Sequence, residues 1–497
     1  MIVKDAQPFT LVEDDGFKAF VHLLDPTYNI PGRKALKKMV EANYKATKEE
    51  AMAEVRKASA VSLTADMWTS MNMDAYLAVT CHYITDQAKM STVLLGVGKF
   101  TQSHTAAHLA EVKHTLMVEW GIRGKVRSLV TDCAANMVAR ANLLSVRHVT
   151  CFPHVLNLVV KKSLSQTPEL EEIRTRARRI VGHFKSSTKA KEKLSEMQVN
   201  MGRKELKMIQ EVDTRWNSVF AMLDRLYNIR EPLGAALTTL STDLSPITAE
   251  DYETIRQCLA VLKPFHQATV ELSEERRVSG SKVIPLIKML KHTVVGQCAQ
   301  IRHNVGAKLA TNLKNNLLDK FALLEKISTL SVATLLDPRF KAAGFCSATC
   351  AQGATVRLTR ECAHFFEADV SDGSAPQESA VTPGTSVQEA EDNLWALLDC
   401  EVGSQQVTNP TASATVEVQG YLKEPNVART EDPLDYWVTH KALYPQLFKV
   451  AMQFLCTPAS SVPCERIFSK AGEIVSQRRS RLKPSTVEQI LFLNKNL

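Results

Sequence analysis

The sequence predicts an α/β domain followed by a long all-α region. Residues 57–160 contain five short β-rich runs with helical stretches between them, which is typical of a mixed sheet. From about residue 161 to residue 341, apolar positions recur at helical spacing almost without a break. We therefore divide the chain into a helical lead-in (1–56), a sheet domain (57–160), a helical insertion (161–367), a flexible linker (368–419) and a C-terminal helical region (420–497).

The lead-in has apolar and basic residues at helical spacing, interrupted by Pro31 and Gly32. The sheet domain then changes to β-rich runs. The first three, which short polar connections join, predict an antiparallel meander, and the order βββαβαβα predicts a mixed sheet. The strands are expected at 60–66, 76–84, 91–97, 126–132 and 148–151, and the helices at 105–120, between the last two strands, and from Pro153.

Asp66 and Asp132 end the first and fourth predicted strands. Those two strands can lie side by side in such a sheet, which would place both carboxylates at one edge. Clustered carboxylates repel each other, so a pair of Mg²⁺ ions that carries out phosphoryl transfer would explain them. Alternatively, the two residues are ordinary turn residues at strand ends.

The helical insertion carries the basic cluster Arg174, Arg176, Arg178 and Arg179, which could contact phosphates or form a solvated helix face. Arg215 and Trp216 are adjacent, and a guanidinium beside an indole could stack on an unpaired base, although a buried tryptophan is the common alternative. The spacing of Cys346, Cys350, Cys362 and His364 is poor for zinc, so we expect no structural zinc.

The linker at 368–419 is rich in Ser, Thr, Pro, Gly and Gln. Beyond it, large apolar side chains must pack against the rest of the chain or against a second copy, and we expect them to drive dimerisation. A helix that begins near Pro463 holds Glu465 in its first turn, where the carboxylate could complement the helix dipole. The dimerisation candidates are Trp437, Tyr444, Phe448 and Phe454, and further DNA-binding candidates near the end are Arg478, Arg479, Arg481 and Lys483.

Composition sets wide limits on function. The 497 residues carry 61 Lys and Arg against 53 Asp and Glu, a formal net charge of +8, which allows a polyanionic partner without requiring one. The first residues have no apolar signal sequence, and no long uncharged apolar run occurs, so a membrane partner is not expected. The 11 scattered cysteines favour reduced thiols in the cytosol or nucleus.

Six motifs occur in order at residues 64–70, 130–137, 151–158, 214–218, 335–341 and 461–472. Together they resemble the motifs of hAT-superfamily transposases, and are most similar to those of the vertebrate zinc finger BED domain-containing proteins. The resemblance implies an RNase H-like catalytic core interrupted by an α-helical insertion, with a C-terminal hAT dimerisation region. It also implies a nuclear, DNA-binding homodimer or higher oligomer in which Asp66, Asp132 and Glu465 form a DDE triad that binds Mg²⁺. Cys151 and His154 would be the family's C-x-x-H motif, and Trp216 would stabilise a flipped base.

The N-terminal BED finger of the family is missing before residue 8, so we expect binding that depends weakly on DNA sequence and steeply on salt. Three hypotheses remain open. The chain is a transposase that cleaves and joins DNA, a domesticated nuclear regulator of chromatin or transcription without that activity, or a structural dimerisation module.

Overall fold

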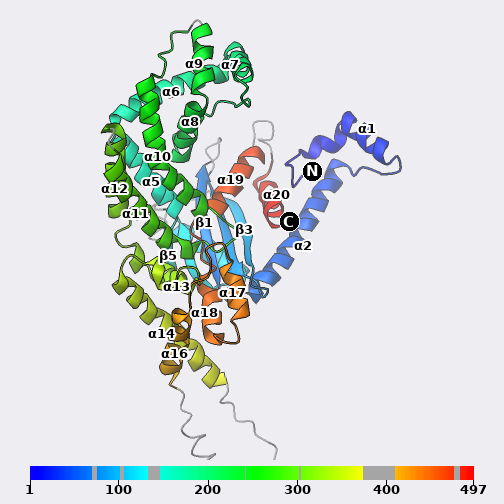
Figure 1. Ribbon diagram of the computed structural model, residues 1–497. Coiled ribbons are helices and arrows are strands. Elements are labelled where there is room, and N and C mark those ends of the chain that lie inside the picture. Colours follow the sequence, from blue (N-terminus) through cyan, green and yellow to red (C-terminus); the bar gives the residue numbers. More distant parts are fainter. Residues whose placement is uncertain are drawn as a thin grey trace, which may run out of the picture.

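The computed structural model describes residues 1–69, 75–100, 106–132, 146–240, 242–301, 304–372, 409–474 and 482–497. A sheet occupies the middle of the molecule, and a tall group of helices rises along one side of it (Figure 1). Helices from the two ends of the chain lie together on the other side (Figure 1). Within the described residues, no helix is long and apolar enough to cross a membrane.

The sheet has five strands in the order β3-β2-β1-β4-β5. The first three strands pair antiparallel, and β4 and β5 run parallel to β1, which confirms the predicted mixed sheet and its meander. The strand bounds are β1 Val61–Thr69, β2 Ala75–Ile84, β3 Met90–Phe100, β4 Val126–Thr131 and β5 Arg147–Thr150.

The first and third strands end three residues later than predicted, β1 at Thr69 and β3 at Phe100. β1 does not end at Asp66, because Met67, Trp68 and Thr69 continue the antiparallel pairing with β2. Asp66 is therefore held on both sides along the strand by a hydrogen-bonded ladder. The helix expected between the last two strands falls in residues 133–145, outside the described residues.

Helices η1, α1 and α2 precede the sheet, and α3 follows its third strand. Helix α2 packs against the last helix of the chain, where the rings of Tyr44 and Phe492 meet edge to face with centroids 5.0 Å apart. The two ends of the chain thus stabilise each other. The bounds are η1 Phe9–Glu13, α1 Asp15–Leu24, α2 Arg33–Lys57 and α3 Ala106–Glu119.

The helical domain begins directly after β5 and forms a continuous core with the C-terminal helices that pack on it. Helix α10 begins with a capping box that Thr248 and Asp251 form. The bounds are α5 Phe152–Ser165, α6 Pro168–Ser186, α7 Thr188–Asn200, α8 Trp216–Asn228, α9 Arg230–Thr239, α10 Ala249–Leu272, η2 Gly280–Lys282, α11 Val283–Gln300, α12 Asn304–Lys320, η3 Leu324–Lys326, α13 Ser328–Leu336, η4 Lys341–Gly344 and α14 Ala348–Asp372.

The C-terminal helices divide between the two parts of the molecule. Helices α16 and α18 pack on α13 and α14 of the helical domain, whereas α19 and α20 return to the sheet (Figure 1). Both ends of the predicted linker are helical instead, since α14 extends to Asp372 and α16 begins at Pro410; residues 373–408 lie outside the described residues. The bounds are α16 Pro410–Lys423, α17 Pro433–Thr439, α18 Pro445–Phe454, α19 Val462–Ile474 and α20 Pro484–Asn496.

The sheet face toward α19 contains a buried histidine. The His82 ring is 0% exposed, with Nδ1 3.0 Å from the Thr92 hydroxyl and Nε2 3.0 Å from the Thr80 hydroxyl. Burial lowers the pKa of His82 to about 4, because the charged ring has no water around it. The neutral ring satisfies both nitrogens, one as donor and the other as acceptor.

We expect His82 to make the fold acid-sensitive. The pKa of His82 in the fold lies below the usual value of about 6.5. The contribution of the neutral ring to the free energy of unfolding is therefore complete above pH 6.5 and is lost as the pH falls toward 4. The difference corresponds to about 3 kcal/mol. Thermal melting of wild type and His82→Gln between pH 7 and pH 4 should show a flatter acid dependence in the variant, and the exposed control His22→Gln should follow wild type. Equal slopes for all three proteins would contradict this role.

Candidate active site

Strand register brings Asp66 and Asp132 together. Thr64 lies opposite Val130 in the parallel β1–β4 pair, and two residues further along the two chains are Asp66 and Asp132. Side chains two apart share a face, so Asp66 lies on the same face of the sheet as Thr64 and Trp68. Asp66 inside β1 and Asp132 directly after β4 therefore lie on neighbouring strands, and the sequence predicted that these two strands could lie side by side.

Helix α19 brings the third carboxylate to that face. The Cys464 thiol lies 3.3 Å from the Thr64 hydroxyl, and the Phe468 ring stacks on Trp68 at a centroid distance of 6.0 Å. These two contacts are one helical turn apart and fix the helix against the strand residues on either side of Asp66. Glu465, the residue after Cys464, stands in the first turn of α19, where the helix N-terminus favours a carboxylate.

The three carboxylates influence one another. The pKa of Asp66 is raised to about 7, first because it is removed from water and further because Glu465 and Asp132 are negatively charged nearby. The Met67 amide donates to Asp66 Oδ1 at 2.9 Å and acts in the opposite direction. A cation at this edge of the sheet would remove the repulsion, which is the usual reason for placing carboxylates together.

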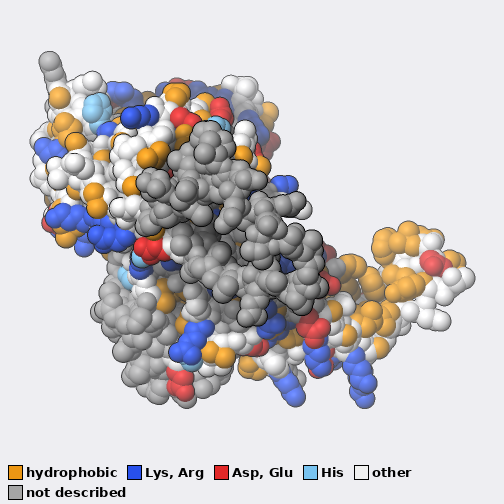
Figure 2. Space-filling view, turned by 90° about the horizontal axis from the view of Figure 1, so that it is seen from below, with side chains coloured by type: hydrophobic (Ala, Val, Ile, Leu, Met, Phe, Trp, Pro, Cys, Tyr) orange, Lys and Arg blue, Asp and Glu red, His pale blue; other side chains and the backbone are white. Residues whose placement is uncertain are grey.

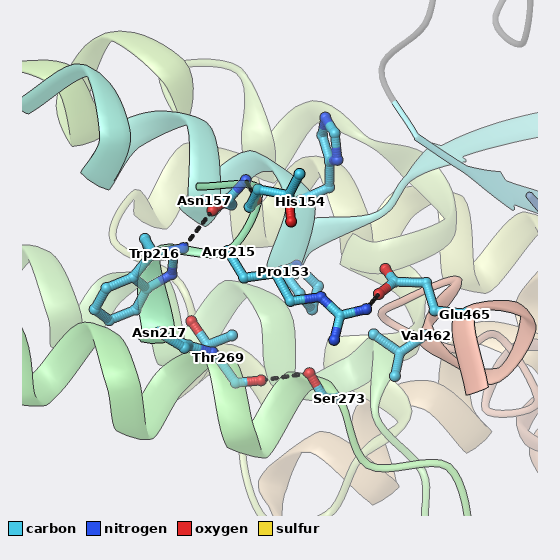
Figure 3. Close-up of a pocket in the computed structure, with 11 residues that line it drawn as sticks. Pro153, His154, Asn157, Arg215, Trp216, Asn217, Thr269, Ser273, Val462 and Glu465 are labelled. Atoms are coloured by element: carbon cyan, nitrogen blue, oxygen red, sulfur yellow. Dashed lines mark hydrogen bonds and ion pairs between the residues drawn. The ribbon is translucent and has the colours of Figure 1, made fainter. Parts of the chain in front are cut away.

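Glu465 also pairs with an arginine of the helical domain. Arg215 Nη2 lies 3.2 Å from Glu465 Oε2, and the pair borders a cavity of about 480 Å³ between α5, α8, α10 and α19. In Figure 3, the Arg215 guanidinium reaches across the cavity to the Glu465 carboxylate. Within the described ranges, no three His, Cys, Asp or Glu side chains converge closely enough to hold a metal ion. The ion pair engages Glu465 Oε2, so a cation shared with the two aspartates would either use the other carboxylate oxygen or displace Arg215.

Helix α5 positions Arg215 through residues that the sequence analysis did not select. Asn157 Oδ1 accepts a hydrogen bond from the Trp216 amide at 3.1 Å, and its Nδ2 donates to the Thr214 carbonyl at 3.3 Å. Lys161 Nζ donates to the Asp213 carbonyl at 2.7 Å. The sequence did indicate that these residues belong to the site, because Asn157 and Lys161 follow His154 at helical spacing on one face of α5.

The Cys151 and His154 pair divides between two environments. Cys151 is buried, its pKa is raised to about 11 by burial, and its sulfur accepts the Ser461 amide at 3.4 Å. It therefore anchors the loop that leads into α19. His154 lines the cavity, and its ring projects away from the Arg215 guanidinium (Figure 3).

Trp216 follows the alternative of a buried tryptophan. Its side chain is 2% exposed and meets Phe220 and His266 edge to face in the core of the helical domain. Its indole nitrogen is without a hydrogen-bond partner in the described part of the chain, although it borders the cavity. In this conformation a base could not stack on the ring without displacing its neighbours.

Three arginines of the predicted basic cluster are engaged within the chain. Arg176 forms a two-pronged ion pair with Asp251, at 2.7 and 2.6 Å. Arg174 and Arg178 both pair with Glu211, whose side chain is 1% exposed. In the structure these three side chains hold α6 to neighbouring segments, and their contact with phosphates stays a prediction.

The remaining basic candidates differ from these three. Arg179 is exposed on α6, and no partner for its side chain is found among the residues that the structure describes. Lys483 is exposed at the start of α20. Arg478, Arg479 and Arg481 lie outside the described residues.

Arg176 and Arg179 form a matched pair for a test. We expect Arg176→Ala to destabilise the fold by about 1.5–3 kcal/mol, since it leaves Asp251 without its charged partner. Arg179→Ala should leave stability unchanged and, where Arg179 meets a phosphate, flatten the logarithmic salt dependence of DNA binding by about 0.9. Thermal melting and a binding titration from 50 to about 200 mM salt measure both. A stable Arg176→Ala variant with a flatter salt dependence of DNA binding would indicate that Arg176 contacts DNA.

The four dimerisation candidates are buried within their own chain. Trp437 is 0% exposed and donates through Nε1 to the Leu336 carbonyl at 2.8 Å, while Tyr444 donates to Glu424 at 2.7 Å. Phe454 is 1% exposed, and Phe448 is half-buried against the same core. These side chains pack against the rest of their own chain, the first of the two alternatives, and their role in dimerisation stays a prediction.

Comparisons with known proteins agree with this architecture. Residues 64–151 match the model of the ZBED1 RNase-like domain, 149–261 that of the ZBED1 RNase-like helical domain, and 417–497 that of the hAT family C-terminal dimerisation region.

The human zinc finger BED domain-containing protein 4 is 27% identical over 516 residues, covering 100% of this chain and 43% of that protein. The mouse zinc finger BED domain-containing protein 6 is 26% identical and covers 100% of this chain and 54% of its own length. The putative AC transposase of Zea mays is 27% identical and covers 99% of this chain and 63% of its own. The chain thus spans about half the length of the first two relatives.

Proposed function

Because the chain belongs to the hAT group of ZBED-like, transposase-derived proteins, we propose that it binds DNA in the nucleus and cleaves and joins DNA strands at a DDE site. The catalytic residues of this proposal are Asp66, Asp132 and Glu465. The observation that supports it is the mutual repulsion of these carboxylates at one edge of the sheet, which contributes to raising the pKa of Asp66 to about 7.

The donor chemistry fits Mg²⁺, which prefers carboxylate oxygens. Asp66 and Asp132 would hold the ion on the sheet, and Glu465 would complete its ligands from α19. When bound, the metal supplies a nucleophilic water and stabilises the leaving oxygen of a phosphodiester. The residues of the chain keep that edge partly removed from water and orient the carboxylates through the β1 ladder and the α19 contacts.

Arg215 has a place in the same proposal. Its guanidinium lies at the cavity and neutralises Glu465 at 3.2 Å. A DNA phosphate that enters the cavity would compete with Glu465 for Arg215, since arginine binds both groups with the same fork of donors. Substrate would then release Glu465 toward the aspartates.

The same ion pair favours a second candidate function. Because Arg215 already neutralises Glu465 through Oε2, this carboxylate has a counter-charge without a metal, which suits a domesticated nuclear DNA-binding regulator that no longer cleaves. The human zinc finger BED domain-containing protein 4 matches the whole of this chain as well as the transposase from maize does.

One experiment separates the two functions. The protein is incubated with duplex DNA that carries the sequences flanking its coding region, with Mg²⁺, Mn²⁺ or chelator, and strand breaks are mapped. Metal-dependent breaks at defined positions support the transposase. Binding without breaks in any metal supports the regulator, and the absence of both contradicts the proposal.

A further inference from the structure

Two groups of apolar side chains lie away from the candidate active site and reach solvent. On α1 they are exposed, on the end of the molecule that projects to the right in Figure 2. Lys18 and Asp15 of that helix pair with each other at 3.6 Å, so its charge does not select a partner. The second group forms the floor of a pocket beside α7, at the opposite end of the helical domain from α14 (Figure 1). This second group is partly enclosed and is surrounded by charges of mostly one sign.

The pocket, which we call the α7 pocket, lies between α6, α7 and the segment that joins α7 to α8. Its volume is about 270 Å³, slightly below the range of about 300–1,000 Å³ that small-molecule sites occupy. Phe184 and Leu194 are 2% and 3% exposed, and Leu206 and Met208 are half-buried. The floor of the α7 pocket is therefore apolar, and its size suits one or two large apolar side chains.

Hydrogen bonds hold the connecting segment against α7. The Gln198 side chain is buried, and its Oε1 accepts the Leu206 amide at 2.9 Å while its Nε2 donates to the Leu206 carbonyl at 3.3 Å. Arg225 of α8 donates to the Lys207 carbonyl. A pocket whose wall is already ordered loses little conformational entropy when a ligand binds, so these contacts favour binding.

The rim of the α7 pocket is basic. Lys185, Lys191 and Lys207 line it with exposed side chains, and none of the three forms an ion pair within the described part of the chain. The carboxylate among the lining residues is Glu205, which accepts a hydrogen bond from the Ser195 hydroxyl. Three lysines against one glutamate give the lining a formal net charge of +2, which attracts an anionic ligand.

The floor favours a peptide over a nucleic acid. Unpaired bases bind proteins by stacking on accessible aromatic faces, whereas the aromatic ring of this floor, Phe184, is buried. Phosphates would pair with the lysines and leave Leu194 and Met208 without a partner. A peptide with carboxylates beside a leucine or phenylalanine would contact both the rim and the floor, and the flexible Met208 side chain can adapt to its shape.

We propose that the α7 pocket docks an acidic peptide segment of a partner protein. A large apolar side chain of the segment enters the pocket, and its carboxylates pair with Lys185, Lys191 and Lys207. None of the residues that line the α7 pocket lines the cavity at Arg215 and Glu465, so the proposal does not depend on DNA cleavage and is tested without it.

The first test uses synthetic peptides and the full chain. The probe is a short fluorescent peptide with glutamates on both sides of a phenylalanine. Two comparison peptides have serine in place of the phenylalanine, or lysine in place of the glutamates. Fluorescence anisotropy measures the dissociation constants, which we expect to be at least about tenfold higher for each comparison peptide than for the probe. No binding of the probe, or equal binding of the serine peptide, would overturn the proposal.

The second test locates the binding at the α7 pocket. Lys185→Glu/Lys191→Glu reverses two rim charges, and the control Lys189→Glu/Lys204→Glu makes the same change in net charge at exposed lysines outside the lining. The rim variant should bind the probe at least about tenfold more weakly and should gain affinity for the lysine peptide, which an unfolded protein would not do. The control should stay within about threefold of wild type at physiological salt, where the Debye length is about 8 Å. An equal loss in both variants, or no gain on the lysine peptide, would refute the assignment.

A parallel titration distinguishes the peptide from DNA. Wild type, the rim variant and the control are titrated with single-stranded and duplex DNA at the same salt concentration. We expect the rim variant and the control to bind DNA equally, because both lose the same net charge. A rim variant that loses DNA affinity and keeps the wild-type affinity for the probe would assign the α7 pocket to nucleic acid and overturn the proposal.

Discussion

Asp66→Asn is expected to abolish Mg²⁺-dependent strand cleavage while DNA affinity stays within about twofold of wild type. The substitution removes a proposed metal ligand on β1 and leaves the strand pairing intact. We expect a rate loss of more than about 100-fold, because even the partners of metal ligands contribute 10–100-fold. Cleavage in Mg²⁺ and a parallel binding titration measure the two quantities.

The same variant should gain stability. The pKa of Asp66 in the fold, about 7, lies above its usual value. At low pH the carboxyl is neutral and does not destabilise the fold, and the fold loses stability as the pH rises toward 7. Asparagine carries no charge, and it should therefore raise the melting temperature at pH 8 and have little effect at pH 4. A carboxylate that costs stability in the absence of metal is more consistent with a ligand than with a structural turn residue.

A control on the same helix as Glu465 makes the cleavage result specific. Glu473→Gln lies two turns further along α19, is exposed, and pairs only with Lys470 among the described residues. It should retain cleavage, whereas Glu465→Gln should lose it. Nicking that persists in Asp66→Asn and Glu465→Gln would assign the activity to another site and refute the DDE proposal.

The part of the candidate site that depends on strand order could be predicted from the sequence. Alternating residues and turn signals were sufficient for the meander and for the parallel return of β4, and hence for the neighbourhood of Asp66 and Asp132. The end of β1 was misplaced, since its last three residues are held by pairing with β2, which a single strand does not reveal.

Two interpretations did not take account of partners that are distant in sequence. Arg176 was a phosphate candidate because its neighbours in the chain are basic, yet its partner Asp251 is 75 residues away. Trp437 was expected at a dimer interface because its own segment is too short to bury it, yet the Leu336 carbonyl that it meets is 101 residues upstream. Local patterns predict which residues are apolar or charged, and they do not predict what will cover them.

The motif at residues 335–341 had no assigned role in the sequence, and the structure gives it one. It is the point at which the C-terminal region returns to the helical domain after residues 373–408. Lys341 donates to the carbonyls of Tyr421 and Glu424 at 2.7 and 2.9 Å, and the amide of Val427 donates to the Pro338 carbonyl at 3.1 Å. Lys341 adopts a positive φ of 43°, which is costly for a residue with a Cβ and is held by these contacts.

Asp337→Ala is expected to cause the largest loss of stability. Asp337 is 0% exposed and accepts hydrogen bonds from Arg339 Nε at 2.8 Å, Arg339 Nη2 at 2.7 Å and the Ser281 hydroxyl at 2.6 Å. Its removal leaves a guanidinium whose side chain is 6% exposed without a counter-charge. Breaking a buried ion pair costs about 3–5 kcal/mol, which should lower the melting temperature by several degrees.

The exposed Asp319→Ala, at the C-terminal end of α12, is the matched control for Asp337→Ala and should remain within about 0.5 kcal/mol of wild type. Scanning calorimetry measures both variants. Because Asp337 and Arg339 form a unit, Asp337→Ala/Arg339→Met should recover part of the loss, since an apolar side chain no longer needs a buried partner. Equal melting temperatures for Asp337→Ala and Asp319→Ala would show that residues 335–341 do not join the C-terminal region to the helical domain.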